Sequence, residues 1–287
     1  MTATGAAPAR GPWSPRALLA AAHPGPSIAV TGLTTALSVA FGNSPSTSAT
    51  VALAVLTGQL SIGWANDAND SARDRKAVRR DKPVAQGALD ARTVWIAAVL
   101  AAAACVPLSL ATGPAAGAAH LLAVGGGWAY DLGLKRTRWS WLPYAWSFGL
   151  LPVFTGLAGG ASGPPTSVIA SAAVLGTAAH LFNGLPDIDE DRAAGLRPLP
   201  VALGPTATRW LGAALLAVPG SLLAAQAGAH ARWAWTPAGA TVVLAALAAA
   251  LGTGGPSANR WRAQLPFVLV VLAAAVDVTL LLVLLPR

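Results

Sequence analysis

The chain has 287 residues, of which 54% are hydrophobic and only 10% are charged, and its formal net charge is +8. Apolar runs of roughly 18 to 22 residues recur along its length, enough to cross a hydrocarbon layer about 30 Å thick. This pattern excludes a water-soluble globular protein, and the single cysteine, Cys105, excludes an intramolecular disulfide. The basic residues lie between the apolar runs rather than on a soluble basic face. They therefore indicate orientation in a membrane, and no nucleic-acid partner is expected.

In chain order, the apolar runs predict nine transmembrane helices, separated by segments rich in glycine and proline. The predicted spans are residues 27–42, 47–65, 93–112, 114–133, 140–159, 166–185, 205–228, 234–253 and 263–285. We therefore expect an all-α integral membrane protein built as a bundle of nine transmembrane helices. Residues 1–26 would form an N-terminal cytoplasmic segment, and residues 27–287 a single transmembrane domain.

The basic residues also predict how this bundle is oriented. With the N-terminus in the cytoplasm, all 19 Lys and Arg residues except Arg232 and Arg287 fall on the cytoplasmic side. An excess of Lys and Arg marks the cytoplasmic side of membrane proteins, so the C-terminus is expected outside. All acidic residues except Asp277, which lies within a span, share the cytoplasmic side. That face therefore combines carboxylates with cations.

The second predicted span leads directly into the segment NDANDSARD, residues 66–74. Asn66, Asp70 and Asp74 are spaced by four residues, and on a helix each such step advances about 400° and rises about 6 Å. The three side chains are therefore expected on one stripe of a helix, with Asp67 near that stripe.

The sixth predicted span leads into a similar segment, HLFNGLPDIDEDRAAG, residues 180–195. Asn183, Asp187 and Asp191 repeat the spacing of four, although Pro186 is expected to disturb the helix locally. Four spans separate the two acidic motifs, and an even number of crossings returns the chain to the same face. The segment that contains Lys135 follows the fourth span and emerges there too. Three polar segments are therefore expected to converge over one helix bundle.

Two facing groups of carboxylates repel each other unless a cation lies between them. Mg²⁺ suits this arrangement, because it binds a few carboxylates, retains waters and takes phosphate oxygens as its other ligands. Basic side chains of the same three segments are available for further phosphate oxygens. They are Arg73, Arg75, Lys76, Arg79, Arg80, Lys82, Lys135, Arg136 and Arg192. A diphosphate is therefore the expected ligand class, held at the mouth of an apolar cavity.

These segments resemble those of a known family. The resemblance is carried by the first acidic motif, by Lys82–Pro83 with Gly87, by the segment YDLGLKRTRWSWLPYA that begins at Tyr130, and by Asp187 with Asp191. Together with the nine-span layout, these features resemble the UbiA superfamily of intramembrane prenyltransferases over nearly the whole chain.

The resemblance implies roles for individual residues. Mg²⁺ ligands would be Asn66, Asp70, Asp74, Asp187 and Asp191, and the catalytic residues would be Asp70, Asp187 and Lys135. Tyr130 and Lys135 would contact the diphosphate or the allylic carbon, although they are five residues apart here and four apart in many members. We assign the remaining substrate contacts to Asp67, Arg73, Arg79, Lys82, Arg136, Asn183 and Arg192. The roles of Asp131, Asp189 and Asp277 stay open.

The expected function is Mg²⁺-dependent transfer of an isoprenyl group from a prenyl diphosphate to an aromatic or lipophilic acceptor, with release of diphosphate. The alternative is a terpene cyclase of the same superfamily, which converts a prenyl diphosphate without an external acceptor. A transporter is disfavoured because few polar residues occupy the middle of the spans. Arginine far exceeds lysine, and alanine, glycine and proline abound, which is typical of a GC-rich genome. We therefore expect a bacterial inner membrane protein, surrounded by lipid, whose active site faces the cytoplasm.

Overall fold

The computed structural model describes residues 14–76, 82–160, 163–227, 232–251 and 260–284. Within these ranges the chain forms eleven α-helices and three short 3₁₀-helices, and no β-strand occurs there. The α-helices are α1 (Pro15–Ala21), α2 (Pro24–Ala40), α3 (Pro45–Lys76), α4 (Ala91–Leu110), α5 (Pro114–Leu132), α6 (Leu142–Leu157), α7 (Thr166–Gly184), α8 (Ile188–Ala193), α9 (Leu199–Gln226), α10 (Trp235–Leu251) and α11 (Arg260–Leu284). The 3₁₀-helices are η1 (Leu134–Arg136), η2 (Ala158–Gly160) and η3 (Arg232–Ala234).

The prediction of an all-helical membrane protein is confirmed. Six segments are long and apolar enough to cross a membrane: Pro45–Arg75, Ala91–Leu110, Thr166–Gly184, Leu199–Gln226, Arg232–Leu251 and Leu265–Leu284. Helices α2 and α6 overlap predicted spans but have only 17 and 16 residues. Such helices are about 25 Å long, less than the hydrocarbon thickness of about 30 Å. The short helices α1 and α8 were not predicted, and the count of nine crossings stays a prediction.

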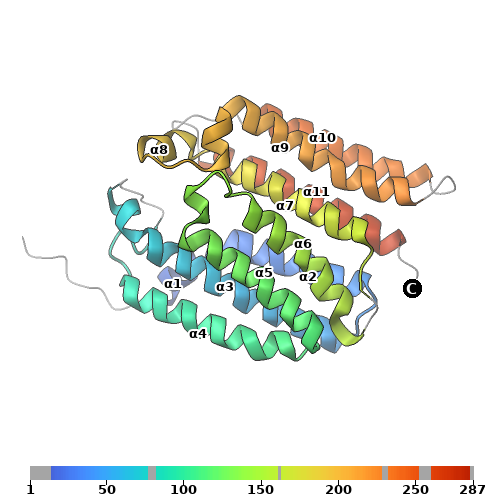
Figure 1. Cartoon of the computed structure of the whole chain (residues 1–287), viewed down its shortest axis with the longest axis horizontal. Helices are drawn as coiled ribbons and strands as arrows, with labels where there is room; N and C mark the ends of the chain where they lie inside the picture. Colours follow the sequence, from blue (N-terminus) through green and yellow to red (C-terminus); the bar gives the residue numbers. More distant parts are fainter. Residues whose placement is uncertain (1–13, 77–81, 161–162, 228–231, 252–259, 285–287) are drawn as a thin grey trace, which may run out of the picture.

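The long helices pack in chain order into a bundle. From α2 to α7 each helix contacts the next one, α7 contacts α9, and the series continues through α10 to α11. The last helix, α11, packs back against α2, so the two ends of the series meet. Figure 1 shows α7, α9, α10 and α11 together in one part of the bundle and α2 to α6 in the other.

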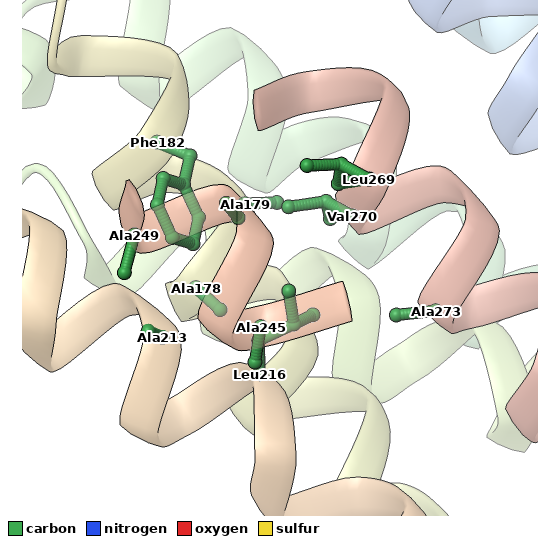
Figure 2. Packing of buried hydrophobic residues seen from close by; sticks show 11 residues of the cluster. Ala178, Ala179, Phe182, Ala213, Leu216, Ala245, Ala249, Leu269, Val270 and Ala273 are labelled. Atoms are coloured by element: carbon green, nitrogen blue, oxygen red, sulfur yellow. The ribbon is translucent and has the colours of Figure 1, made fainter. Parts of the chain in front are cut away.

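Small side chains allow these helices to approach closely. Figure 2 shows the largest apolar cluster, in which α7, α9, α10 and α11 meet. Its buried members are Ala178, Ala179, Phe182, Ala213, Leu216, Ala245, Ala248, Ala249, Leu269, Val270 and Ala273. Between α6 and α7 the approach is closer still, because a Cβ on Gly176 would lie 2.6 Å from the carbonyl oxygen of Tyr144. Lipid gives no hydrophobic drive for helix association, so this tight packing is what holds the bundle together.

Helix α3 carries the first acidic motif toward one end of the bundle. Its 32 residues make a helix about 48 Å long, which exceeds the hydrocarbon thickness of about 30 Å. Figure 1 shows the C-terminal end of α3 and the short helix α8 at the same end of the bundle, opposite the end where the chain terminates. The acidic end of α3 and the segment that follows α7 therefore lie at one end of the bundle.

Candidate functional site

Helix α3 continues without interruption through the first acidic motif, as the spacing predicts. Asp67, Asp70 and Asp74 are exposed by only 1%, 4% and 2%, so other parts of the protein cover this end of α3. Buried carboxylates are unfavourable unless each has a counter-charge, hydrogen-bond donors or a metal ion. The surroundings of these three side chains therefore decide what the motif does.

Among the described residues, Lys135 makes the shortest ion pair with these carboxylates. The chain turns from α5 into η1, and the Lys135 Nζ lies 2.7 Å from Asp70 Oδ2 and 3.5 Å from Asp131 Oδ1. Only 6% of the Lys135 side chain is exposed. Asn66 Nδ2 donates a hydrogen bond of 2.7 Å to the same Asp131 oxygen. These four residues form one buried network, and Asp131 is a member that the sequence did not assign to the site.

Two more cations lie against this end of α3. Arg73 Nη2 is 3.2 Å from Asp70 Oδ2, and its Nε is 3.9 Å from Asp74 Oδ1. Lys82 Nζ lies 3.2 Å from Asp67 Oδ1. The Arg73 side chain is 38% exposed and the Lys82 side chain 13%, so both can still meet a ligand that arrives from outside. Both cations lie beside carboxylates of the first motif.

The second acidic motif departs from the predicted stripe. Helix α7 ends before Pro186, and α8 begins two residues after it. Proline has no amide hydrogen, and its ring clashes with the carbonyl group four residues earlier, so the helix breaks here. Asp187 occupies the N-cap position of α8, and the Asp191 amide donates to the Asp187 carbonyl at 2.8 Å. The disturbance expected at Pro186 is therefore confirmed. It is large enough that Asn183 lies on α7 whereas Asp187 caps α8 and Asp191 lies within α8, so the three do not lie on one stripe.

Helix α8 nevertheless brings the second motif to the first. The Asp191 carboxyl interacts electrostatically with Asp70 and Arg73 of α3. Burial raises the pKa of Asp191 to about 6, the adjacent Asp187 adds to this rise, and Arg73 opposes it. From α5, Tyr130 lies within electrostatic range of both Asp187 and Asp191. The two acidic motifs and the Tyr130 segment therefore converge, as the sequence predicts.

Some predicted substrate contacts do not join this network. The Arg136 side chain is exposed. Arg192 pairs instead with Asp189, at 2.9 Å, and both side chains are more than half exposed. Among the described residues, neither the Arg136 nor the Arg192 side chain forms an ion pair with the buried carboxylates of α3. Arg79 lies outside the described residues.

An aromatic and polar cluster beside the second motif was not predicted. Asn183 Nδ2 donates to the Tyr144 hydroxyl at 3.3 Å, so this predicted substrate contact serves here as a partner of Tyr144. The Tyr144 ring centroid lies 5.2 Å from that of Tyr130 and 5.0 Å from that of His180. His180 Nε2 in turn lies 2.9 Å from Ser140 Oγ. The position of Tyr144 in the same polar segment as Tyr130 is the signal that could have identified it.

The donor atoms of this site suit a hard divalent cation. Asp70 Oδ1 and Asp131 Oδ2 are buried and have no hydrogen-bond partner among the described residues. Within that part of the chain, no three Asp, Glu, His or Cys side chains gather closely enough to enclose a metal ion by themselves. Mg²⁺ does not need such an enclosure, because it retains waters and combines one or two carboxylates with substrate phosphates. The residues therefore fit Mg²⁺ together with a phosphorylated ligand.

One curated protein is similar to this chain over part of its length. The chain is 32% identical over 175 residues to the bacteriochlorophyll synthase 33 kDa chain of Cereibacter sphaeroides. The aligned region covers 57% of this chain and 58% of that protein. It therefore spans less than two thirds of the relative's length.

Solved structures share the fold over most of the chain. A UbiA homologue from Archaeoglobus fulgidus, bound to GPP and Mg²⁺, has a TM-score of 0.69 at 16% identity, covering 92% of this chain and 99% of that chain. The apo structure of a UbiA homologue from Aeropyrum pernix K1 has a TM-score of 0.68 at 19% identity, covering 90% and 98%. At these identities the likeness shows the fold alone. The sequence itself matches the UbiA prenyltransferase family over residues 27–283, and the chain therefore belongs to that family.

Proposed function

We propose that this chain is an integral membrane prenyltransferase, which moves an isoprenyl group from its diphosphate to an aromatic or lipophilic acceptor and releases diphosphate. Family membership supports the reaction class and favours transfer over the cyclase alternative. The observation that carries the proposal is that α8 and the acidic end of α3 lie at the same end of the bundle (Figure 1), with Asp191 within electrostatic range of Asp70 and Arg73. Two acidic motifs from distant parts of the chain must meet in this way before they can share one diphosphate.

We propose Mg²⁺ as the cofactor, in line with the ion bound by the Archaeoglobus homologue. The proposed ligands are Asn66, Asp70, Asp74, Asp187 and Asp191. When bound, Mg²⁺ would supply positive charge that offsets the charge growing on the departing diphosphate. Asn66 and Asp70 now contact Asp131 and Lys135. We therefore expect these two residues to exchange partners when the site is filled.

The basic residues of the site have a separate task. As the allylic C–O bond breaks, its electron pair goes to the diphosphate oxygen, and donors fixed near that oxygen stabilise the new charge. Lys135 is the best placed, because its burial keeps water from screening it. Arg73 and Lys82 would hold outer phosphate oxygens, and Tyr130 would face the same region. The electron-poor allylic carbon is then open to attack by the acceptor.

The proposed setting is the lipid of a bacterial inner membrane, with nine spans and the site on the cytoplasmic face. The distribution of Lys and Arg supports this orientation. The location of α8 and the end of α3 at one end of the bundle is compatible with it (Figure 1). We propose further that residues 27–287 form one catalytic unit.

The test is a substrate screen with purified protein in detergent. Prenyl diphosphates of several chain lengths are incubated with Mg²⁺, with and without aromatic acceptors, and both diphosphate release and products are measured. We expect diphosphate release that depends on acceptor and stops when EDTA removes the metal. Asp187→Asn should abolish it, whereas Asp189→Asn, a matched change at an exposed position of the same helix, should not. Release of a cyclic product without acceptor would establish the cyclase instead.

A further inference from the structure

The corner between α1 and α2 lies directly on the helix that carries the first acidic motif. Gly63 of α3 makes this possible, because a Cβ there would lie 2.5 Å from the carbonyl oxygen of Ala22. The neighbouring Trp64 donates its indole N–H to the Leu18 carbonyl at 2.8 Å. Gly63 and Asp67 are four residues apart and share one face of α3. The corner therefore packs one helical turn from the first buried carboxylate of the site.

His23 occupies this corner in an unfavourable backbone conformation. Its φ of 52° and ψ of 62° lie in the left-handed region. Among the described residues it is the only one other than glycine with a positive φ. Glycine takes this conformation without strain, and histidine, like asparagine and aspartate, takes it more readily than most other residues. A residue other than glycine in this conformation is a candidate for a functional role, which the contacts of its side chain must support.

The side chain of His23 reaches the charged residues of the site. Its Nε2 lies 2.9 Å from Lys82 Nζ, and the same Nζ lies 3.2 Å from Asp67 Oδ1. An ammonium group only donates, so the imidazole accepts this hydrogen bond through an unprotonated Nε2. Lysine has three donors. With two directed at His23 and Asp67, a third is left for a phosphate oxygen.

We propose that His23 is a positioning residue, which holds the Lys82 ammonium at the rim of the diphosphate site. This inference rests on the proposed function. The chain beyond Lys82 is fixed as well, since Val84 is buried in a cluster with Ala21 and Leu89. The flexible stem of Lys82 is thereby fixed at its backbone by α1 packing and at its tip by His23. Loss of His23 would leave Asp67 as the one remaining anchor of Lys82 among the described residues, and it would weaken substrate binding rather than the chemical step.

The test compares three substitutions that separate the backbone from the side chain. His23→Ala removes the acceptor, His23→Gly removes both acceptor and strain, and His23→Gln keeps an acceptor at similar reach. We expect Ala and Gly to raise KM for the prenyl diphosphate about tenfold, the size of one charge-assisted hydrogen bond, with kcat nearly unchanged. Gln should restore KM to within about threefold of wild type. The His23→Gly variant should be at least as stable as His23→Ala, because glycine adopts the positive φ without strain. If only His23→Ala folds poorly, the KM of His23→Gly still tests the role of the side chain.

A double-mutant cycle with Lys82→Met shows whether His23 acts through Lys82. If it does, His23→Gly should have no further effect once Lys82 is replaced. Binding of inorganic pyrophosphate in the presence of Mg²⁺, measured by calorimetry, gives a readout that needs no turnover. A wild-type protein that binds no pyrophosphate would overturn the proposed function itself. Normal pyrophosphate binding in both wild type and His23→Gly would overturn only the role of His23.

Discussion

Replacement of Lys135 by methionine probes the buried network, because methionine has a similar length and no charge. In the native protein the Lys135 Nζ lies 2.7 Å from Asp70 Oδ2 and 3.5 Å from Asp131 Oδ1. At an effective dielectric constant of about 20, two unit charges 2.7 Å apart attract each other by about 6 kcal/mol, most of which offsets their desolvation. Removal of one partner leaves the other charges buried without compensation, at a cost of about 3 to 5 kcal/mol.

We expect Lys135→Met to lower both stability and turnover. A loss of about 3 kcal/mol corresponds to a fall in Tm of about 6 to 12 °C for a chain of this size. Turnover should fall about 100- to 1,000-fold, as when one fixed donor is removed from beside a developing negative charge. Thermal unfolding in detergent gives the first quantity, and kcat at saturating prenyl diphosphate gives the second. Added Mg²⁺ should bind more tightly than to wild type, because Lys135 no longer competes for Asp70.

Arg232→Met is the matched control for this experiment. Arg232 is exposed, and it follows α9, which leads away from the acidic end of the bundle (Figure 1). Its loss should change neither Tm nor kcat. If Lys135→Met kept the wild-type Tm and a turnover within threefold of wild type, the buried network would have neither the energetic nor the chemical role described above.

Three further predictions concern single side chains. The metal-free protein should lose stability as the pH rises from about 4 to 6. Burial raises the pKa of Asp191 to about 6, so in this pH range the folded protein holds the Asp191 proton more tightly than the unfolded chain does. Asp191→Asn should therefore flatten this part of the curve of Tm against pH. Tyr144→Phe should lower turnover less than tenfold and leave Tm nearly unchanged, since water can replace the hydroxyl as the partner of the exposed Asn183. A large fall in Tm would instead show a structural role for the hydroxyl group. Asp277→Asn should raise Tm or leave it unchanged, with a normal kcat. The reason is that neither oxygen of this buried carboxyl group has a hydrogen-bond partner among the described residues. A fall in Tm would contradict this prediction.

Local patterns in the sequence were enough to predict several features. The apolar runs predict the helical membrane fold, because a helix that crosses lipid must be apolar along nearly its whole length. The spacing of Asn66, Asp70 and Asp74 places them on one helix, since helical periodicity depends only on positions along the chain. The even number of spans between the two acidic motifs predicts that both reach the same end. Each of these inferences uses information that is contained in one segment or in a count of segments.

Other features depend on contacts between segments, which no local pattern encodes. The sequence places Lys135 in a polar segment between spans and does not indicate its burial, yet η1 buries it between Asp70 and Asp131. Arg192 likewise lies in a polar segment between spans, yet its side chain is about half exposed and pairs with Asp189. Composition and spacing do not distinguish these two residues, because burial depends on which helices pack beside them. The sequence by itself determined the fold class and the location of both acidic motifs at the same end of the bundle. Only the tertiary structure decided which charges are buried together, since burial and pairing arise when distant helices meet.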